Sequence, residues 1–310
     1  MSLPDESGAR EIARSVLGEP VRSLVRFPTG FQHWVYDVVL DSGRPVVLRI
    51  ASPENRAALA GAVYWHARLR PLRVPVAALL HTDLDAALPF LVFERLPGTD
   101  LGHVYGKLSA AERANLASTI AELQNRTAQL PEARGFGYAL DYDASLARDW
   151  RGVLGGSLRR GRSWIARGGV VDIGWADRVE ARLARCGDLF EDVRPRAFLH
   201  DVTTKNVIVH EGALTGIVDI DSMAFGDPLW TVALTRMSLL ASGQPTDYIE
   251  AWCDAMATGS VSLERLDLYT ALHGLNFLGE LGQAFNRDAS VPADPDQRAR
   301  LEQTLAWLLQ

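Results

Sequence analysis

The sequence has few cysteines, no long apolar run and no surplus of basic residues. Its two cysteines, Cys186 and Cys253, are far apart and match no metal-ligand spacing, so we expect free thiols in a reducing compartment and no disulfide framework. No stretch approaches the roughly 18 apolar residues that a membrane-spanning helix needs, and the acidic N-terminus shows no secretory signal. These absences predict a cytoplasmic protein without a membrane partner.

The balance of charges argues against a nucleic-acid partner. The 310 residues include 32 lysines and arginines against 38 aspartates and glutamates, a formal charge of −6, whereas phosphate backbones are bound through an excess of basic residues. The rest of the composition is typical of a soluble globular protein, with 47% hydrophobic and 23% charged residues. A chain of this length can form two domains, or one large one, around a substantial core.

The first third of the chain is expected to form a small antiparallel sheet with one long helix. Short β-rich runs predict strands at residues 21–27, 34–40, 45–50, 75–81 and 89–96. Prolines bracket the long helix, which is expected over residues 54–70, and a shorter helix is expected over residues 5–18.

From residue 98 onward the pattern becomes mainly helical. Ser109 and Glu112 form a capping-box pattern that opens a helix running towards residue 130. Further helices are expected near 144–158 and 175–187 and throughout the chain after residue 228, and short strands at 197–199, 207–209 and 214–220. We therefore divide the chain into a β-rich domain, residues 1–97, and a helical domain, residues 98–310.

The short strands inside this helical region carry the residue types that phosphoryl transfer requires. Asp201 is followed five positions later by Asn206 and then by an apolar strand, and Asp219 ends a second apolar strand. If the two strands pair as a hairpin through residues 210–213, Asn206 and Asp219 converge at one end. In phosphoryl transfer, one carboxylate takes the proton of the acceptor hydroxyl, while an amide oxygen and a second carboxylate hold Mg²⁺.

This arrangement resembles the catalytic and metal-binding segments of the protein-kinase-like superfamily. It is most similar to the aminoglycoside phosphotransferase family, with its Asp-x-x-x-x-Asn loop and its Ile/Val-Asp motif followed by Gly-Asp-Pro, here Gly226-Asp227-Pro228. The resemblance extends over nearly the whole chain, because further family motifs follow in the same order: Val47-Leu48-Arg49, the connector Phe93 to Thr99, and Gly135-Phe136-Gly137.

The resemblance implies an α+β, two-lobed, protein-kinase-like fold, with an antiparallel sheet and one helix in the N-terminal lobe and a mainly helical C-terminal lobe. It also implies a Mg²⁺-dependent kinase that moves the γ-phosphoryl group of ATP or GTP to a hydroxyl of a small molecule, such as an aminoglycoside-like antibiotic in a resistance enzyme. By the same resemblance Asp201 is the catalytic base, and Asn206 and Asp219 are the metal ligands. Asp221 is either a secondary ligand or a neighbour that tunes the site.

The nucleotide side departs from the family pattern. Arg49 stands where many kinases have a lysine that contacts phosphate, and arginine keeps the positive charge. Residues 59–62, in the middle of the long helix, contain no acid to pair with Arg49, so either Glu54 replaces that acid or Arg49 is held in another way. Gly30 is the single glycine of the expected phosphate-covering loop. Backbone groups of the connector are expected to contact the nucleotide base, at Phe93, Glu94 and Leu96.

Three further polar residues near these motifs are interpreted as structural. His200, directly before Asp201, is expected to form structural hydrogen bonds, and Lys205 is expected to be solvated. Asp227, which precedes a proline, is expected to cap a helix.

The sequence leaves the acceptor open. Acids on the later helices would suit a cationic acceptor or are merely solvated, and aromatic residues there would line an apolar acceptor pocket or belong to the core. The acids are Asp247, Glu250, Asp254, Glu280 and Asp288, and the aromatic residues are Trp230, Trp252, Tyr269 and Phe277. The alternatives are a metabolic kinase for choline, a sugar or homoserine, and a non-catalytic, nucleotide-binding pseudokinase.

Overall fold

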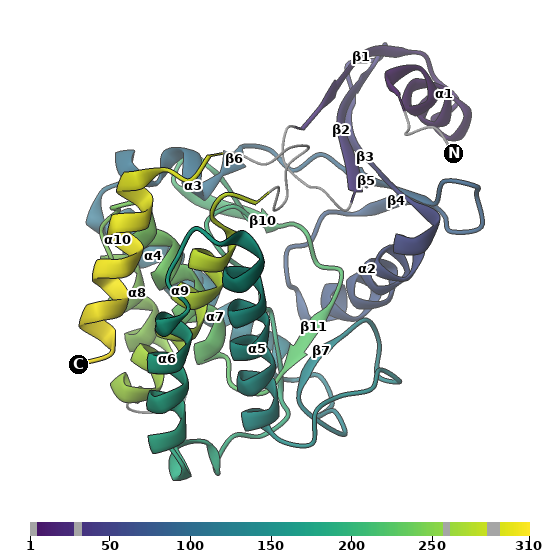
Figure 1. The fold of residues 1–310 in the computed structure, drawn as a ribbon. Coiled ribbons are helices and arrows are strands. Elements are labelled where there is room, and N and C mark those ends of the chain that lie inside the picture. The colour runs from purple at the N-terminus through teal and green to yellow at the C-terminus, as the bar shows by residue number, and fades with distance from the viewer. Residues whose placement is uncertain (1–4, 28–32, 257–260, 284–291) are drawn as a thin grey trace.

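The computed structural model describes residues 5–27, 33–256, 261–283 and 292–310. Figure 1 shows an N-terminal antiparallel sheet with its helices beside a mainly helical C-terminal part. The α+β, two-lobed architecture expected from the sequence is therefore confirmed. We retain residue 97 as the proposed boundary between the two domains.

Five antiparallel strands form the N-terminal sheet in the order β1-β2-β3-β5-β4. They are β1 (Val21–Arg26), β2 (His33–Leu40), β3 (Pro45–Ala51), β4 (Leu79–Asp83) and β5 (Phe90–Glu94). The sequence predicts all five, but the fourth begins at Leu79 instead of Pro75. The reason is a competing contact, because the Pro75 carbonyl accepts the Ile217 N–H of the C-terminal part at 2.8 Å.

The two faces of this sheet pack against different helices. Leu48 of β3 is buried in a cluster with α1 (Glu6–Leu17), whereas Ala51 is buried in a cluster with α2 (Arg56–Leu69). Successive side chains of a strand point to opposite faces, so Arg49 lies on the same face as Ala51 and is directed towards α2. The alternation of side chains along β3 thus places Arg49, the predicted phosphate-contacting residue, on the face of the sheet that packs against α2.

Helices make up most of the C-terminal part, with α9 at its centre. Leu272 and Leu275 of α9 are fully buried, and Figure 1 shows α9 among the other helices. The capping box at Ser109 and Glu112 is present as predicted. The helices are α3 (Leu101–Val104), α4 (Ala110–Thr127), α5 (Trp150–Gly168), α6 (Gly174–Arg185), α7 (Leu229–Ala241), α8 (Asp247–Ala255), α9 (Leu263–Glu280) and α10 (Pro295–Leu308).

The helix predicted over residues 144–158 lies further along the chain, at α5. Its start is fixed by Asp149, whose carboxylate accepts the Gly152 N–H at 2.7 Å as a helix N-cap. Just before it, Ala147 pairs with Phe136 in an isolated β-bridge. That bridge holds the preceding residues in an extended conformation and keeps them out of the helix.

Two small sheets hold the segments that carry Asp201 and Asp219. The first has the order β10-β9-β6 and the second β7-β11-β8, built from β6 (Thr99–Asp100), β7 (Gly137–Ala139), β8 (Ala197–Phe198), β9 (Val207–His210), β10 (Ala213–Ile217) and β11 (Met223–Phe225). The strand predicted over residues 214–220 is too long: β10 ends at Ile217, and Asp219 has a φ of 61°, which no strand contains. Asp201 therefore lies between β8 and β9, and Asp219 lies between β10 and β11.

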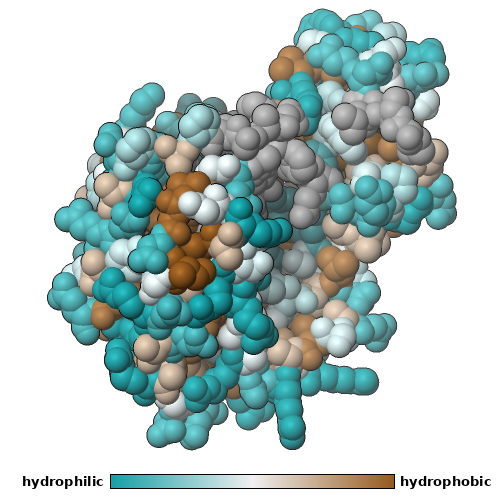
Figure 2. Space-filling view, viewed as in Figure 1, coloured by the Kyte–Doolittle hydropathy of each residue, from teal (hydrophilic) through white to brown (hydrophobic). Residues whose placement is uncertain are grey.

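The surface seen in Figure 2 is mostly hydrophilic, with a smaller hydrophobic cluster over the helical part. Within the described residues, no helix combines the length and the apolar composition needed to cross a bilayer.

Candidate functional site

The loop between β8 and β9 is held together by its own polar side chains. The Thr203 hydroxyl donates to Asp201 Oδ1 at 3.2 Å, and the Asn206 side-chain amide donates to the Asp201 backbone carbonyl at 2.9 Å. The second bond fixes the Asn206 amide and turns its Oδ1 away from that carbonyl. The spacing of five residues between Asp201 and Asn206 thus corresponds to one compact loop.

The predicted hairpin is present and brings Asn206 next to the segment of Asp219. β9 and β10 are antiparallel, with His210 opposite Ala213, and both turn residues between them have positive φ, as tight hairpin turns require. Beyond the paired strands, the Val218 N–H donates to the Asn206 carbonyl at 2.9 Å. This bond holds the residue just before Asp219 against the loop of residues 201–206, the predicted catalytic loop.

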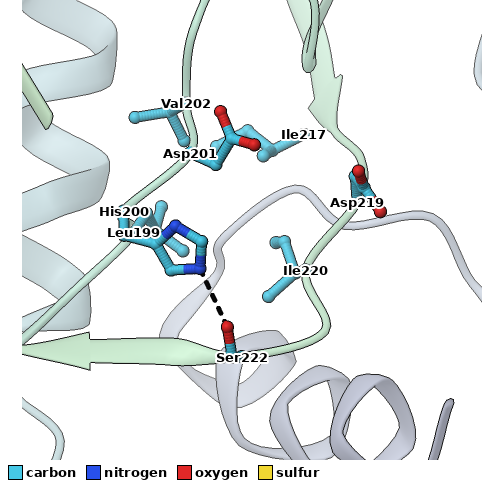
Figure 3. Close-up of a pocket in the computed structure, with 8 residues that line it drawn as sticks. All are labelled: Leu199, His200, Asp201, Val202, Ile217, Asp219, Ile220 and Ser222. Carbon is cyan, nitrogen blue, oxygen red and sulfur yellow. Dashed lines mark hydrogen bonds between the residues drawn. The ribbon is translucent and has the colours of Figure 1, made fainter. Parts of the chain in front are cut away.

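Asp201 and Asp219 line the same small pocket, which Figure 3 shows together with its six other lining residues. Its volume of about 10 Å³ would hold no more than a water molecule, so it marks where the two segments meet and is too small for a nucleotide. The φ of Asp219 is 61°, a region that aspartate visits only occasionally and that is common at functional sites.

The electrostatic surroundings of Asp219 favour a cation. Burial raises the pKa of the Asp219 carboxyl, Arg49 partly offsets that rise, and the carboxylates of Asp221 and Asp201 add to it. The Asp219 side chain is still 53% exposed, so surrounding water weakens these effects. A site in which carboxylates raise one another's pKa gains stability when a divalent cation or a guanidinium lies among them.

Arg49 is the cation that lies there. The Arg49 side chain is only 8% exposed, and its NH1 and NH2 groups donate to Asp221 Oδ1 at 2.6 Å and Oδ2 at 2.5 Å. NH2 also donates to Asp219 Oδ1 at 3.0 Å. Burial tends to raise the pKa of Asp221, but Arg49 and a hydrogen bond from His33 outweigh it and lower that pKa.

These bonds answer the question that the sequence left open about Arg49. Glu54 lies in a short 3₁₀ turn before α2 and its side chain is exposed. The carboxylates that hold Arg49 come instead from the segment after β10. Asp221 was not predicted as the partner of Arg49. The available signal was Gly61 in the middle of a helix, because such a glycine usually marks close packing against another segment.

His200 makes the structural contacts expected from the sequence. His200 Nε2 lies 2.9 Å from the Ser222 hydroxyl, drawn as a dashed line in Figure 3. The His200 ring packs edge-to-face against Tyr138, with ring centres 4.9 Å apart, and burial lowers the His200 pKa. Lys205 is exposed. Asp227 is buried and accepts the Leu229 N–H at the start of α7 at 3.0 Å.

The connector residues lie at the end of the N-terminal sheet. Phe93 and Glu94 end β5, and the buried Phe93 ring packs against His66 of α2 at 5.2 Å. Leu96 follows in the connector and packs against Gly216, where an added Cβ would lie 2.6 Å from Leu96 Cδ1. Gly30 lies outside the described residues. The nucleotide contacts of all four residues stay predictions.

A second, larger cavity lies beside the catalytic loop on the side of α5. It has a volume of about 260 Å³, and Tyr138 connects it to the loop, because the Tyr138 ring contacts His200 while its hydroxyl accepts the Trp230 Nε1–H at 2.7 Å. The cavity is lined by Phe136, Gly137, Tyr138, Ser145, Leu146, Ala147, Val153, Gly156, Ser157, Arg160 and Trp230.

Arg160 is the one charged residue among those that line this cavity in the described part of the chain. Its Nε donates to Asn276 Oδ1 at 3.3 Å and its NH2 to the Ser157 hydroxyl at 3.4 Å. Both partners are neutral. The exposed guanidinium of Arg160 therefore gives this cavity a positive wall.

Most residues that the sequence suggested for an acceptor pocket do not line this cavity. Asp247 forms an ion pair with Arg113 at 2.6 Å, and Trp252 and Tyr269 are fully buried in the core. Glu280 is half-buried at the end of α9, and burial raises its pKa to about 7. Trp230 lines the cavity, Glu250 and Asp254 are exposed, Phe277 is half-buried, and Asp288 lies outside the described residues.

Residues 23–269 match the phosphotransferase enzyme family, APH. This match covers most of the 310 residues, so the chain belongs to that family. It is a small-molecule phosphotransferase, which confirms the reaction class and the family expected from the sequence. Among curated proteins, no sequence matches it.

Several solved structures of similar fold are phosphotransferases or kinases of small molecules. A thermostable mutant of the aminoglycoside phosphotransferase APH(4)-Ia, in a ternary complex with ADP and hygromycin B, is 18% identical over 98% of both chains, with a TM-score of 0.67. The GDP and kanamycin complex of APH(2")-IIia is 14% identical over 96% of this chain and 97% of its own, also with a TM-score of 0.67.

A candidate fructosamine-3-kinase from Thermobifida fusca YX-ER1 is 16% identical over 98% of this chain and 99% of its own, with a TM-score of 0.62. These likenesses confirm the protein-kinase-like fold.

Proposed function

We propose that this chain is a cytoplasmic, Mg²⁺-dependent kinase that moves the γ-phosphoryl group of ATP or GTP to a hydroxyl of a small molecule. The proposal rests on two hydrogen bonds of Asn206, which connect the catalytic loop to the hairpin that precedes Asp219. Asn206 carries both connections, through its side chain to Asp201 and through its backbone to Val218. A pseudokinase would have no need of all three residues, Asp201, Asn206 and Asp219.

Each of the three residues has a role that its surroundings support. Asp201 accepts the proton of the acceptor hydroxyl, and the Thr203 hydroxyl holds its carboxylate in place. Asn206 Oδ1 and Asp219 are oxygen donors of the kind that Mg²⁺ prefers. Bound there, Mg²⁺ would neutralise charge on the transferring phosphoryl group.

The acceptor is proposed to bind in the cavity beside α5, because Tyr138 links that cavity to His200 and so to the catalytic loop. Its lining is mostly apolar and aromatic, with two serines, Arg160 and no carboxylate among the described lining residues. A polycationic aminoglycoside would approach an arginine there without a carboxylate to pair with, which is unfavourable in a partly enclosed site. This favours a neutral or anionic hydroxylated acceptor, as in a metabolic kinase, over an antibiotic.

An acceptor screen tests both parts of the proposal. Release of nucleoside diphosphate from ATP and from GTP is measured with kanamycin, hygromycin B, a macrolide, sugars, choline and homoserine, each with Mg²⁺. We expect acceptor-dependent turnover that is greatest with an acceptor that carries no net positive charge. Fastest turnover with an aminoglycoside would overturn the proposed acceptor class, and the absence of turnover with every acceptor would contradict the kinase.

The Asp201→Asn variant tests the catalytic base with the best acceptor of that screen. Loss of a general base costs about 10²- to 10⁴-fold in turnover, and nucleotide affinity should remain as in the wild type. Asp254→Asn, at an exposed position of α8, is the control and should change neither quantity. Unchanged turnover in Asp201→Asn would rule out Asp201 as the base.

A further inference from the structure

Position 61, in the middle of α2, has no room for a side chain. It lies in the part of the helix in which the sequence contains no acid. A Cβ atom added to Gly61 would lie 2.2 Å from the backbone carbonyl oxygen of Asp221 and 3.0 Å from Leu140. Such distances are far below van der Waals contact, so a glutamate at position 61 could not reach into the site from this helix. The glycine instead lets α2 pack directly onto the backbone of the residue that binds Arg49.

The bonding of Asp221 differs from that of Asp219. Both oxygens of Asp221 are used: Oδ1 accepts from Arg49, and Oδ2 accepts from Arg49 and from His33 Nε2, the latter at 3.2 Å. The Asp221 side chain is 19% exposed. Asp219 offers Arg49 only one oxygen and is 53% exposed, so Asp219 retains the freedom to bind a cation and Asp221 does not.

We propose that Asp221 is the residue that positions Arg49 for the nucleotide phosphates, in place of a carboxylate on α2, and that Asp221 is not a metal ligand. The inference rests on the proposed function, in which Arg49 contacts the nucleotide. Two parallel bonds between a guanidinium and a carboxylate fix the plane of the arginine as well as its position. Arg49 comes from β3 and Asp221 from the segment after β10, so this ion pair joins the N-terminal sheet to the metal-binding segment.

The pairing also accounts for arginine at position 49. A lysine ammonium binds as a point charge and cannot occupy both oxygens of Asp221 at once, whereas a guanidinium can. With Asp221 and Asp219 both within reach of NH2, an arginine bridges the two carboxylates and uses only one of its two NH1 hydrogens for Asp221. Arg49 and Asp221 should therefore behave as one unit in nucleotide binding.

A double-mutant cycle in nucleotide binding tests this inference. The affinity for ADP is measured by calorimetry, with and without Mg²⁺, for the wild type, Arg49→Ala, Asp221→Asn and the double variant. Either single change should weaken ADP binding by roughly 10- to 100-fold, and the double variant should be hardly weaker than either one. The strengthening of ADP binding by Mg²⁺ should be the same in Asp221→Asn as in the wild type.

Matched variants separate positioning from loss of structure. Asp267→Asn removes another arginine–aspartate pair, with Arg236 at 2.6 Å, in the helical part and away from the connector, and should leave ADP affinity unchanged. Arg49→Lys keeps the charge but loses the paired bonds, so it should weaken ADP binding in the wild-type background and have little effect in Asp221→Asn. Circular dichroism melting verifies that each variant is folded.

Each outcome supports or contradicts the positioning role of Asp221. Additive effects of Arg49→Ala and Asp221→Asn would overturn the positioning role, and loss of the Mg²⁺ effect in Asp221→Asn would show that Asp221 is a metal ligand. A wild-type protein that binds no nucleotide at all would instead overturn the proposed function, and the inference with it. If Asp221→Asn fails to fold, Arg49→Lys alone carries the test, and unchanged ADP affinity in that variant contradicts the inference.

Discussion

Two arginines lie on the two sides of the proposed reaction site. Carboxylates bind one of them, whereas the other is hydrogen-bonded to neutral side chains. Arg49, on the proposed nucleotide side, is buried and held by carboxylates of Asp221 and Asp219. Arg160, in the cavity beside α5, is exposed, and among the described residues its hydrogen bonds go to the neutral side chains of Asn276 and Ser157, while its guanidinium lies over the Trp164 ring. The first arginine is fixed by the protein, whereas the second has charge left to interact with a ligand.

This difference separates two tasks of a kinase. A buried, doubly bonded arginine has one orientation, which suits a phosphate that must always lie in the same place. An exposed arginine in a largely apolar cavity acts mainly through its long-range charge, and it discriminates between ligands by attracting anions and repelling cations. Variants on the Arg49 side should therefore affect every reaction, and variants on the Arg160 side should affect only the choice of acceptor.

The largest effect is expected from Asp219→Asn, on the Arg49 side. The change removes the charge that would hold Mg²⁺, so turnover should fall by about 10³-fold or more with every acceptor, and added Mg²⁺ should no longer strengthen ADP binding. Turnover and Mg²⁺-dependent ADP affinity are measured together. If Asp219→Asn weakened ADP binding but kept its dependence on Mg²⁺, Asp219 would be only a partner of Arg49.

A smaller and selective effect is expected from Arg160→Glu. Reversing the charge of the cavity wall should shift the ratio of kcat/KM for a cationic acceptor over a neutral one by about tenfold in favour of the cation. ADP affinity should not change. Arg159→Glu is the matched control, because Arg159 is also exposed on α5 but is absent from the cavity lining. An equal shift in both variants would mean that the cavity is not the acceptor site.

The difference between local and long-range contacts explains which features could be predicted from the sequence. The catalytic loop and hairpin are local in the chain, so the spacing of Asp201, Asn206 and Asp219 was sufficient to predict a compact loop next to a hairpin. The sheet strands followed from their periodicity for the same reason. Errors occurred where distant segments compete, as at Pro75, which bonds to Ile217 instead of continuing a strand.

The partner of Arg49 could not be predicted, because it depends on how two distant segments pack. The sequence shows an arginine in place of a lysine and a helix without an acid, but each fact alone leaves several explanations. Only the approach of Gly61 to the Asp221 backbone shows why the helix carries no acid and where the carboxylate comes from. The positive wall of the cavity was missed as well, because Arg160 is one of several arginines in α5 and only the fold distinguishes it.

The smallest effect is expected at Glu280, a carboxyl near Arg160. Burial raises the Glu280 pKa to about 7, against its usual value of 4.5, while Lys205 and Arg160 oppose the rise. Between these two values the folded protein binds more protons at this site than the unfolded chain does, so its contribution to stability is lost as the pH rises.

Glu280→Gln removes this titration. The wild type should lose on the order of 1 to 3 kcal/mol of unfolding free energy relative to the variant between about pH 5 and about pH 8. Urea denaturation of both proteins at the two pH values measures the difference, and groups that titrate equally in both cancel. The same pH dependence in Glu280→Gln as in the wild type would mean that burial does not raise the Glu280 pKa. A charged carboxylate would then lie near Arg160 and balance its charge, and the contrast between the two arginines would fail.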